Sequence, residues 1–233
     1  IWKMGSNSIE KGSRDSWTVR PSDIYAAADE LGGMGAQGTE EDYQRFLQDP
    51  ERRDPRGFII PSDQADFPTA VAFGNALIKN GVHVHRATQD FSVAGVRYPA
   101  GSLVVKTDQA YRPHVLDMFE KQDHPNDFAY PGGPPIPPYD ATGWTLAFQM
   151  GVEFHRILEG FDGPFQEIPD LMKVPAGGIL GDGRDPAGYF LSHEVNNSAS
   201  AVYALLTEGA EVYWLTDRVT VLHHGEILAT GPP

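Results

Sequence analysis

The segment ALIKNGVHVHRAT at residues 76–88 decides the fold, because ALLTEGAEVYWLT at residues 204–216 aligns on it without a gap. Each segment reads as a helix end, a glycine that stops the helix, and an alternating strand. A short apolar strand pattern precedes each helix, GFII at 57–60 and GYFL at 188–191, and a hairpin pattern follows it. The chain therefore carries two similar strand–helix–strand–hairpin units, at residues 57–105 and 188–233.

These two units predict an α/β fold. A strand–helix–strand connection within one sheet makes a right-handed parallel crossover. We therefore expect one doubly wound parallel sheet flanked by helices, with β-hairpin insertions and long Pro/Gly-rich loops. The proline-rich segment around 130–139 joins the units. We expect it to be an ordered crossover that packs on its own domain through Tyr130, Ile136 and Tyr139, although a proline-recognition ligand is the alternative.

The first 56 residues differ from the remainder of the chain. They contain two short helical patterns, starting near Ser22 and Thr39, separated by a glycine-rich stretch. That stretch matches no phosphate-binding loop, because no strand precedes it and no Gly-Lys-Ser/Thr follows. We expect residues 1–56 to be a linker or extension and residues 57–233 to form the α/β domain.

Composition excludes several classes of function. With 18 basic and 32 acidic residues, the net charge of -14 repels a phosphate backbone, so we expect no nucleic-acid partner. No apolar run approaches the roughly 20 residues that span a bilayer. The absence of cysteine excludes disulfides, thiolate metal ligands and cysteine nucleophiles. The first residue is Ile1 and the last three are Gly-Pro-Pro, and we interpret the chain as a piece of a larger protein.

Two polar loops follow the apolar strand patterns, and ligands of open parallel sheets bind beyond such strand ends. They supply the candidate ligand-binding residues, which are Asp63, Gln64, Asp66, His193, Glu194, Asn196 and Asn197. His193 and Glu194 could form an acid–base pair. The alternative is that Asp66 caps one helix and Asn196, Asn197 or Ser198 caps the other, and we favour capping. We assign no catalytic residue.

Histidines supply two candidate metal motifs, and we expect neither to bind metal. His83 and His85 share one face of a strand, but no carboxylate or third histidine lies at a supporting spacing in the sequence. His223-His224-Gly225-Glu226 has the His-x-x-Glu spacing, but it occupies an expected hairpin tip close to the last residue. We therefore expect no cofactor in this chain.

Four strings together resemble a known family. They are residues 4–15 (MGSNSIEKGSRD), 112–119 (RPHVLDMF), 131–144 (PGGPPIPPYDATGW) and the loop that contains Asn197. They resemble the region after the peptidase domain in large bacterial zinc carboxypeptidase-like proteins of the carboxypeptidase A superfamily. In that family a region similar to class I glutamine amidotransferases, flavodoxin-like in fold, follows the peptidase domain.

The resemblance implies an exported parent protein, periplasmic or extracellular, whose peptidase domain binds zinc and acts on peptides. No zinc-ligand motif carries over to this chain, and the amidotransferase nucleophile is a cysteine that it lacks. We therefore expect a non-catalytic accessory domain whose partner is the peptidase domain, and with it a peptide substrate. The alternatives are a hydrolase that uses His193 and Glu194, and a peptide- or glycan-binding module.

Overall fold

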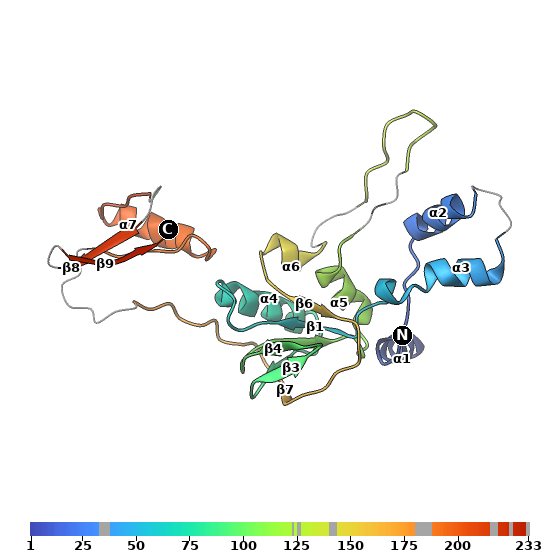
Figure 1. Cartoon of the computed structure of the whole chain (residues 1–233), viewed down its shortest axis with the longest axis horizontal. Helices are drawn as coiled ribbons and strands as arrows, with labels where there is room; N and C mark the ends of the chain where they lie inside the picture. Colours follow the sequence, from blue (N-terminus) through green and yellow to red (C-terminus); the bar gives the residue numbers. More distant parts are fainter. Residues whose placement is uncertain are drawn as a thin grey trace. The chain divides into compact units, whose positions relative to one another are not determined.

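The computed structural model describes residues 1–32, 38–122, 124, 127–139, 144–179, 188–214, 219–223 and 226–231 (Figure 1). The chain divides into two compact units, residues 1–180 and residues 181–233. The first is a mixed α/β unit built on a five-stranded sheet, and the second contains one helix and one hairpin among its described residues. The α/β class is therefore confirmed.

The sheet of the first unit has the strand order β6-β1-β5-β2-β7. Its strands are β1 (Gly57–Ile60), β2 (His85–Ala87), β5 (Leu103–Lys106), β6 (His155–Ile157) and β7 (Phe165–Glu167). Every neighbouring pair is antiparallel, so the expectation of a parallel, flavodoxin-like sheet is wrong for this unit. β1 and β2 run in the same direction, as a strand–helix–strand crossover requires. β5 lies between them and runs in the opposite direction.

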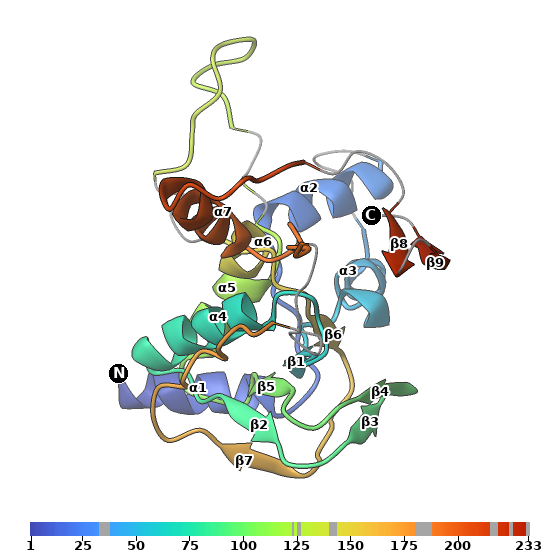
Figure 2. The same ribbon diagram turned by 90° about the vertical axis from the view of Figure 1, so that its left-hand side faces the viewer.

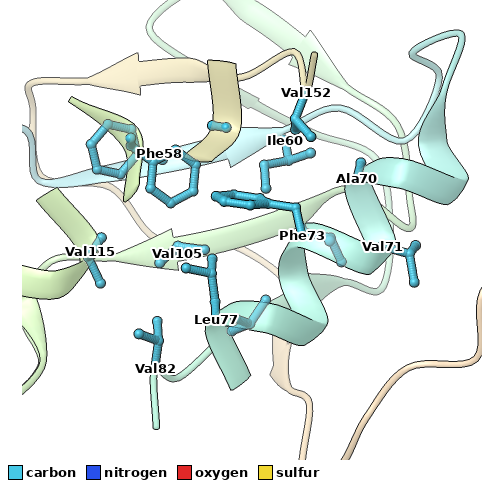
Figure 3. Close-up of a cluster of buried hydrophobic side chains, with 14 of the residues drawn as sticks. Phe58, Ile60, Ala70, Val71, Phe73, Leu77, Val82, Val105, Val115 and Val152 are labelled. Atoms are coloured by element: carbon cyan, nitrogen blue, oxygen red, sulfur yellow. The ribbon is translucent and has the colours of Figure 1, made fainter. Parts of the chain in front are cut away.

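One face of the sheet is covered by helices, as Figures 2 and 3 show. α4 (Phe67–Lys79) begins at Asp66, whose carboxylate accepts a hydrogen bond from the Thr69 amide, and ends before Gly81 at φ +85°. α5 (Arg112–Phe119) and α6 (Leu146–Gln149) lie beside it. The main core lies between these helices and the sheet, where the rings of Phe58 and Phe119 stack at 4.2 Å.

The opposite face is covered near one end by a hairpin, β3 (Phe91–Val93) and β4 (Val96–Tyr98). Its two-residue turn is Ala94-Gly95, and both residues have positive φ, which is the backbone of a type I′ turn. Tyr98 is buried in the second core cluster, and its hydroxyl lies 2.7 Å from His155 Nδ1. The hairpin thus covers the apolar side chains that the sheet presents on this face.

The N-terminal segment forms α1 (Trp2–Gly12), α2 (Pro21–Glu30), α3 (Glu40–Leu47) and the 3₁₀ turn η1 (Pro50–Arg52). At the end of α1, a Cβ on Gly12 would lie 2.0 Å from the Thr107 carbonyl oxygen. Arg56 Nε donates to the Gly12 carbonyl at 2.9 Å. Only a glycine permits this close approach, so α1 is fitted closely to the end of β5.

A buried ion pair attaches the same segment to α5. Asp54 accepts hydrogen bonds from Arg112 at 2.5 Å, from the Thr18 amide at 3.0 Å and from the Thr18 hydroxyl at 2.8 Å. Arg112 is only 5% exposed. Residues 1–56 lie within the first compact unit. The boundary that we expect between residues 56 and 57 stays a prediction.

The proline-rich segment folds back on itself. Phe128 and Pro135 form an antiparallel bridge, and the Ile136 amide donates to the Asp127 carbonyl at 2.9 Å. Tyr130, Ile136 and Tyr139 are 63%, 47% and 105% exposed. The expectation that these three side chains anchor the segment on its own domain is therefore wrong. The segment satisfies its backbone locally, and its side chains face solvent.

The second unit contains α7 (Ser198–Thr207), β8 (Val219–His223) and β9 (Glu226–Gly231). The helix, the stop at Gly209 with φ +81° and the hairpin are as the sequence predicts. The segments 188–191 and 211–214 were expected to be strands. Neither belongs to a sheet in the described part of the chain.

Candidate functional site

The first predicted ligand loop is held mainly by its own polar groups. Gln64 is 9% exposed, and its amide nitrogen donates to the carbonyls of Pro61 at 2.8 Å and Glu153 at 3.3 Å. Its carbonyl oxygen accepts from the Glu153 amide at 3.1 Å. Asp66 caps α4, as the capping interpretation predicts. Of the three predicted residues, Asp63 alone is exposed and available to a ligand in solution.

The second predicted loop is open to solvent. His193, Glu194, Asn196 and Asn197 are all exposed. The Glu194 amide donates to the Ser192 hydroxyl at 3.2 Å, and Asn197 occupies the N-cap position of α7 without a side-chain capping bond.

The His193 ring lies 5.8 Å from the ring of Trp214. Among the described residues, no hydrogen bond joins His193 to Glu194. The structure therefore places the two residues of the predicted acid–base pair on one loop, but it does not pair them. Ligand binding at both loops stays a prediction.

A third cluster lies on the face of the first sheet that also carries the hairpin. His85 of β2 is directly opposite Glu167 of β7, and Lys106 of β5 projects from the same face. His83 Nδ1 lies 2.5 Å from a Glu167 carboxylate oxygen. These side chains border a cavity of about 320 Å³, lined by Ile9, His83, His85, Lys106, Asp108, Gln109, Ala110 and Glu167.

Burial and pairing set the charges of this cluster. The hydrogen bond with His83 lowers the pKa of Glu167 below its ordinary value, so the carboxylate is ionised at neutral pH. Burial lowers the pKa of His85, because the imidazolium loses solvation, and the Lys106 charge acts in the same direction. His85 Nδ1 is buried and has no hydrogen-bond partner within the described structure. The cluster therefore combines one His–carboxylate pair with one uncharged imidazole.

Zinc, which the family resemblance places in the peptidase domain, does not fit this cluster. Within the part of the chain that the structure describes, no three His, Cys, Asp or Glu side chains are placed to hold a metal ion. The positive charge of Lys106 also acts on His85, where it disfavours a cation. The second histidine motif includes His224 and Gly225, which lie outside the described residues.

Sequence reasoning missed the part that Glu167 plays. His83 and His85 were set aside because no carboxylate lies near them in the sequence, yet Glu167 is 84 residues from His83. It comes from an edge strand in a stretch that reads as loop. The alternation in Phe165-Gln166-Glu167, one apolar and one acidic side chain on the same face, is the signal that could have revealed it.

Comparisons with known proteins give no further assignment. Neither family models, nor curated proteins, nor solved structures include a match to this chain. No helix among the described residues is long and apolar enough to cross a membrane.

Proposed function

We propose that this chain is a non-catalytic accessory module of an exported, periplasmic or extracellular, zinc carboxypeptidase-like protein. Its partner is the peptidase domain, which carries the zinc and acts on peptides. The family strings at residues 4–15, 112–119 and 131–144 support this assignment. The accessory role rests on one observation. The second unit presents a set of large apolar side chains to solvent.

The exposed set contains six large apolar side chains among the described residues of the second unit. Tyr189, Phe190 and Leu191 are 67%, 72% and 52% exposed. Tyr203, Tyr213 and Trp214 are 73%, 77% and 78% exposed. Large apolar surfaces that remain exposed typically mark sites of protein–protein interaction. Aromatic residues dominate binding energy at such interfaces, which suits a module that docks on another domain.

The polar loops support the non-catalytic part of the proposal. Gln64 and Asp66 bond to the backbone of their own unit, which explains their presence without chemistry. A hydrolase that uses His193 and Glu194 needs the two side chains to converge on one substrate. The His193 ring instead lies 5.8 Å from the Trp214 ring, with the two ring planes tilted by 44°.

A peptide-binding module is the second candidate, and the proline-rich hairpin favours it. Tyr139 is fully exposed, and Tyr130, in the turn of the hairpin, is 63% exposed. Exposed aromatic side chains can provide the apolar contacts for an extended peptide.

Binding measurements test the accessory role. The chain is titrated into the zinc peptidase domain of a carboxypeptidase-like relative, and the affinity is measured by calorimetry. The double variant Phe190→Ser, Trp214→Ser is expected to weaken binding at least about 30-fold, because two aromatic contacts of at least about 1 kcal/mol each are removed. Tyr139→Ser is the control, because it removes an exposed aromatic from the other unit.

Two outcomes contradict the proposal. Equal affinity of the wild type and the double variant shows that the exposed set takes no part in docking. Loss of binding with Tyr139→Ser alone transfers the role to the proline-rich hairpin and favours the peptide-binding module.

A further inference from the structure

The first unit contains a larger cavity than the one beside the histidines, with a volume of about 460 Å³. Its lining comes from the last turn of α1, from the segment that follows α1, and from α3. We call it the α1–α3 cavity. Trp17, Val19, Tyr43 and Leu47 form its apolar part. Tyr43 and Leu47 are four residues apart and share one face of α3, so the helix turns this face to the cavity.

The two aromatic rings of the cavity are ordered by contacts with their own unit. The Trp17 indole nitrogen donates to the Asp49 carbonyl at 2.8 Å, which fixes the orientation of the ring. The Tyr43 ring packs against Gly38, where an added Cβ would lie 3.1 Å from the ring. Side chains that are already ordered lose little conformational entropy when a ligand binds. The cavity therefore offers a preorganised apolar surface.

The free polar groups of the cavity favour hydrogen-bond donation. The Lys11 ammonium group donates only, and the Gln48 amide and the Tyr43 hydroxyl can donate as well as accept. Within the described part of the chain, none of these three side chains makes a hydrogen bond or an ion pair. Arg14 has one exposed ion pair, with Glu10 at 3.4 Å, and such a pair is easily exchanged for another partner.

The two carboxylates of the lining already have partners. Asp15 is paired with Arg53 at 2.9 Å, and Glu40 accepts a hydrogen bond from the Gln44 amide at 3.1 Å. The cavity therefore suits a ligand that has apolar side chains and presents hydrogen-bond acceptors.

The proline-rich hairpin has the complementary chemistry. Residues 134–139 (PPIPPY) include four prolines, which lack an N–H, so this run presents carbonyl acceptors and few donors. The Ile136 amide is already bonded to the Asp127 carbonyl. Proline also fixes φ near −65°, which preorganises an extended polyproline II chain. Chains of this kind dock in aromatic-lined grooves.

The hairpin presents this run to solvent. Its turn is closed by a hydrogen bond from the Gly133 amide to the Tyr130 carbonyl at 2.8 Å, with Pro131 and Gly132 between them. Gly132 has φ +77°, as the third position of a type II turn requires. Figure 1 shows the hairpin as a long, narrow loop in yellow-green. Because Tyr139 is fully exposed, the apolar end of the run is accessible to a partner.

A second copy of the chain is the occupant that the structure supports best. No hydrogen bond, ion pair or ring contact joins the described residues of the hairpin to those of the cavity, so one copy leaves both surfaces open. The hairpin has no charged residue from Phe128 to Tyr139. Each copy has a net charge of -14, and the cationic groups of Lys11 and Arg14 attract an incoming acidic chain.

We propose that two copies of this chain associate by docking the proline-rich hairpin of one copy in the α1–α3 cavity of the other. Ile136 and Tyr139 meet the apolar lining, and the proline carbonyls accept hydrogen bonds from the free donors. Exchange of hairpins in both directions gives a closed dimer with twofold symmetry. The inference involves the first unit only and does not rest on the proposed docking role of the second unit.

Sedimentation equilibrium of the full chain measures this association. The wild type is expected to form dimers as its concentration rises through the micromolar range. The hairpin variant Ile136→Ser, Tyr139→Ser and the cavity variant Tyr43→Ser are each expected to weaken association at least about tenfold, because each removes apolar contacts in both halves of the dimer. Val96→Ser is the matched control, because it removes an exposed apolar side chain from β4 and should change nothing.

Mixing the two variants separates lost docking from lost folding. The hairpin variant keeps an intact cavity, and the cavity variant keeps an intact hairpin, so a mixed dimer retains one complete contact. An equimolar mixture is therefore expected to associate at least about fivefold more strongly than either variant alone. A variant that had failed to fold would give no such recovery.

Three results overturn the inference. One is a wild type that stays monomeric, even where its cavity binds a free peptide of residues 133–139, because the proline-rich ligand would then come from another protein. The second is self-association that neither variant weakens, which places the contact elsewhere on the chain. The third is a mixture that associates no more strongly than the separate variants.

Discussion

Removing the carboxylate of Asp54 should destabilise the first unit strongly. Asp54 accepts hydrogen bonds from Arg112, Ser16 and Thr18, which brings the N-terminal segment onto α5. Asp54→Ala leaves the guanidinium of Arg112 buried at 5% exposure without its counter-charge. Breaking a buried ion pair from one side costs about 3–5 kcal/mol.

Native-state hydrogen exchange of the full chain measures this loss. The slowest amides of β1 and β5 report the opening of the central strands. A loss of 3–5 kcal/mol accelerates their exchange by roughly 150- to 4,000-fold, at about 1.4 kcal/mol for each factor of ten. Arg112→Met alone should cost a similar amount, because it leaves the carboxylate partly buried.

The double variant Asp54→Leu, Arg112→Met provides the control. Replacing both members of a buried pair by apolar groups is often nearly neutral, so exchange should return to within about tenfold of the wild type. A change below tenfold in Asp54→Ala would refute the argument that this contact fixes residues 16–54 on α5. Additive losses in the double variant would show that the two side chains act independently.

Three further predictions follow from local geometry. Gly12→Ala should destabilise the first unit by about 1–3 kcal/mol in urea unfolding, whereas Gly5→Ala in the same helix should stabilise it by about 0.5–1 kcal/mol. Asp66→Ala should lower the free energy of unfolding by about 1 kcal/mol, because it removes the cap of α4, and Asp63→Ala should lower it by less than about 0.5 kcal/mol. Equal losses in the two variants would contradict this ranking. The pKa of His85 is lower in the folded chain than in the unfolded chain, so the unfolded chain binds the proton more readily. Stability should therefore fall as the pH drops below 6.5. Thermal melts of His85→Gln should show a smaller decrease in melting temperature over the same pH range.

Local signals in the sequence predict the local structure well. The helix from Phe67, its Asp66 cap and its Gly81 stop follow from short-range chemistry, and all three are present. The order of the strands does not follow in this way. Leu103–Lys106 reads as a buried strand, but nothing in its apolar run states that its neighbours are β1 and β2 rather than other strands. Sheet neighbours are set by non-local packing, and the parallel prediction failed for this reason.

The candidate site residues also divide into those with local roles, which the sequence predicts, and those with long-range partners, which it does not. The capping role of Asp66 is local and was predictable, whereas the pairing of His83 with Glu167 joins two distant strands. The exposure of Tyr139 was also missed, because an apolar side chain in a proline-rich segment suits either a core anchor or a solvent-facing hairpin. Sequence alone does not separate these two outcomes.

Zinc content and peptidase activity of the purified chain test the central claim most directly. After equilibration with zinc and dialysis, the metal is counted by mass spectrometry, and hydrolysis is measured on peptides with varied C-terminal residues. A non-catalytic module predicts zinc well below one equivalent and no turnover above that of the buffer. One equivalent of zinc with turnover that disappears in His83→Ala or Glu167→Ala would contradict the account and make the histidine cluster an active site.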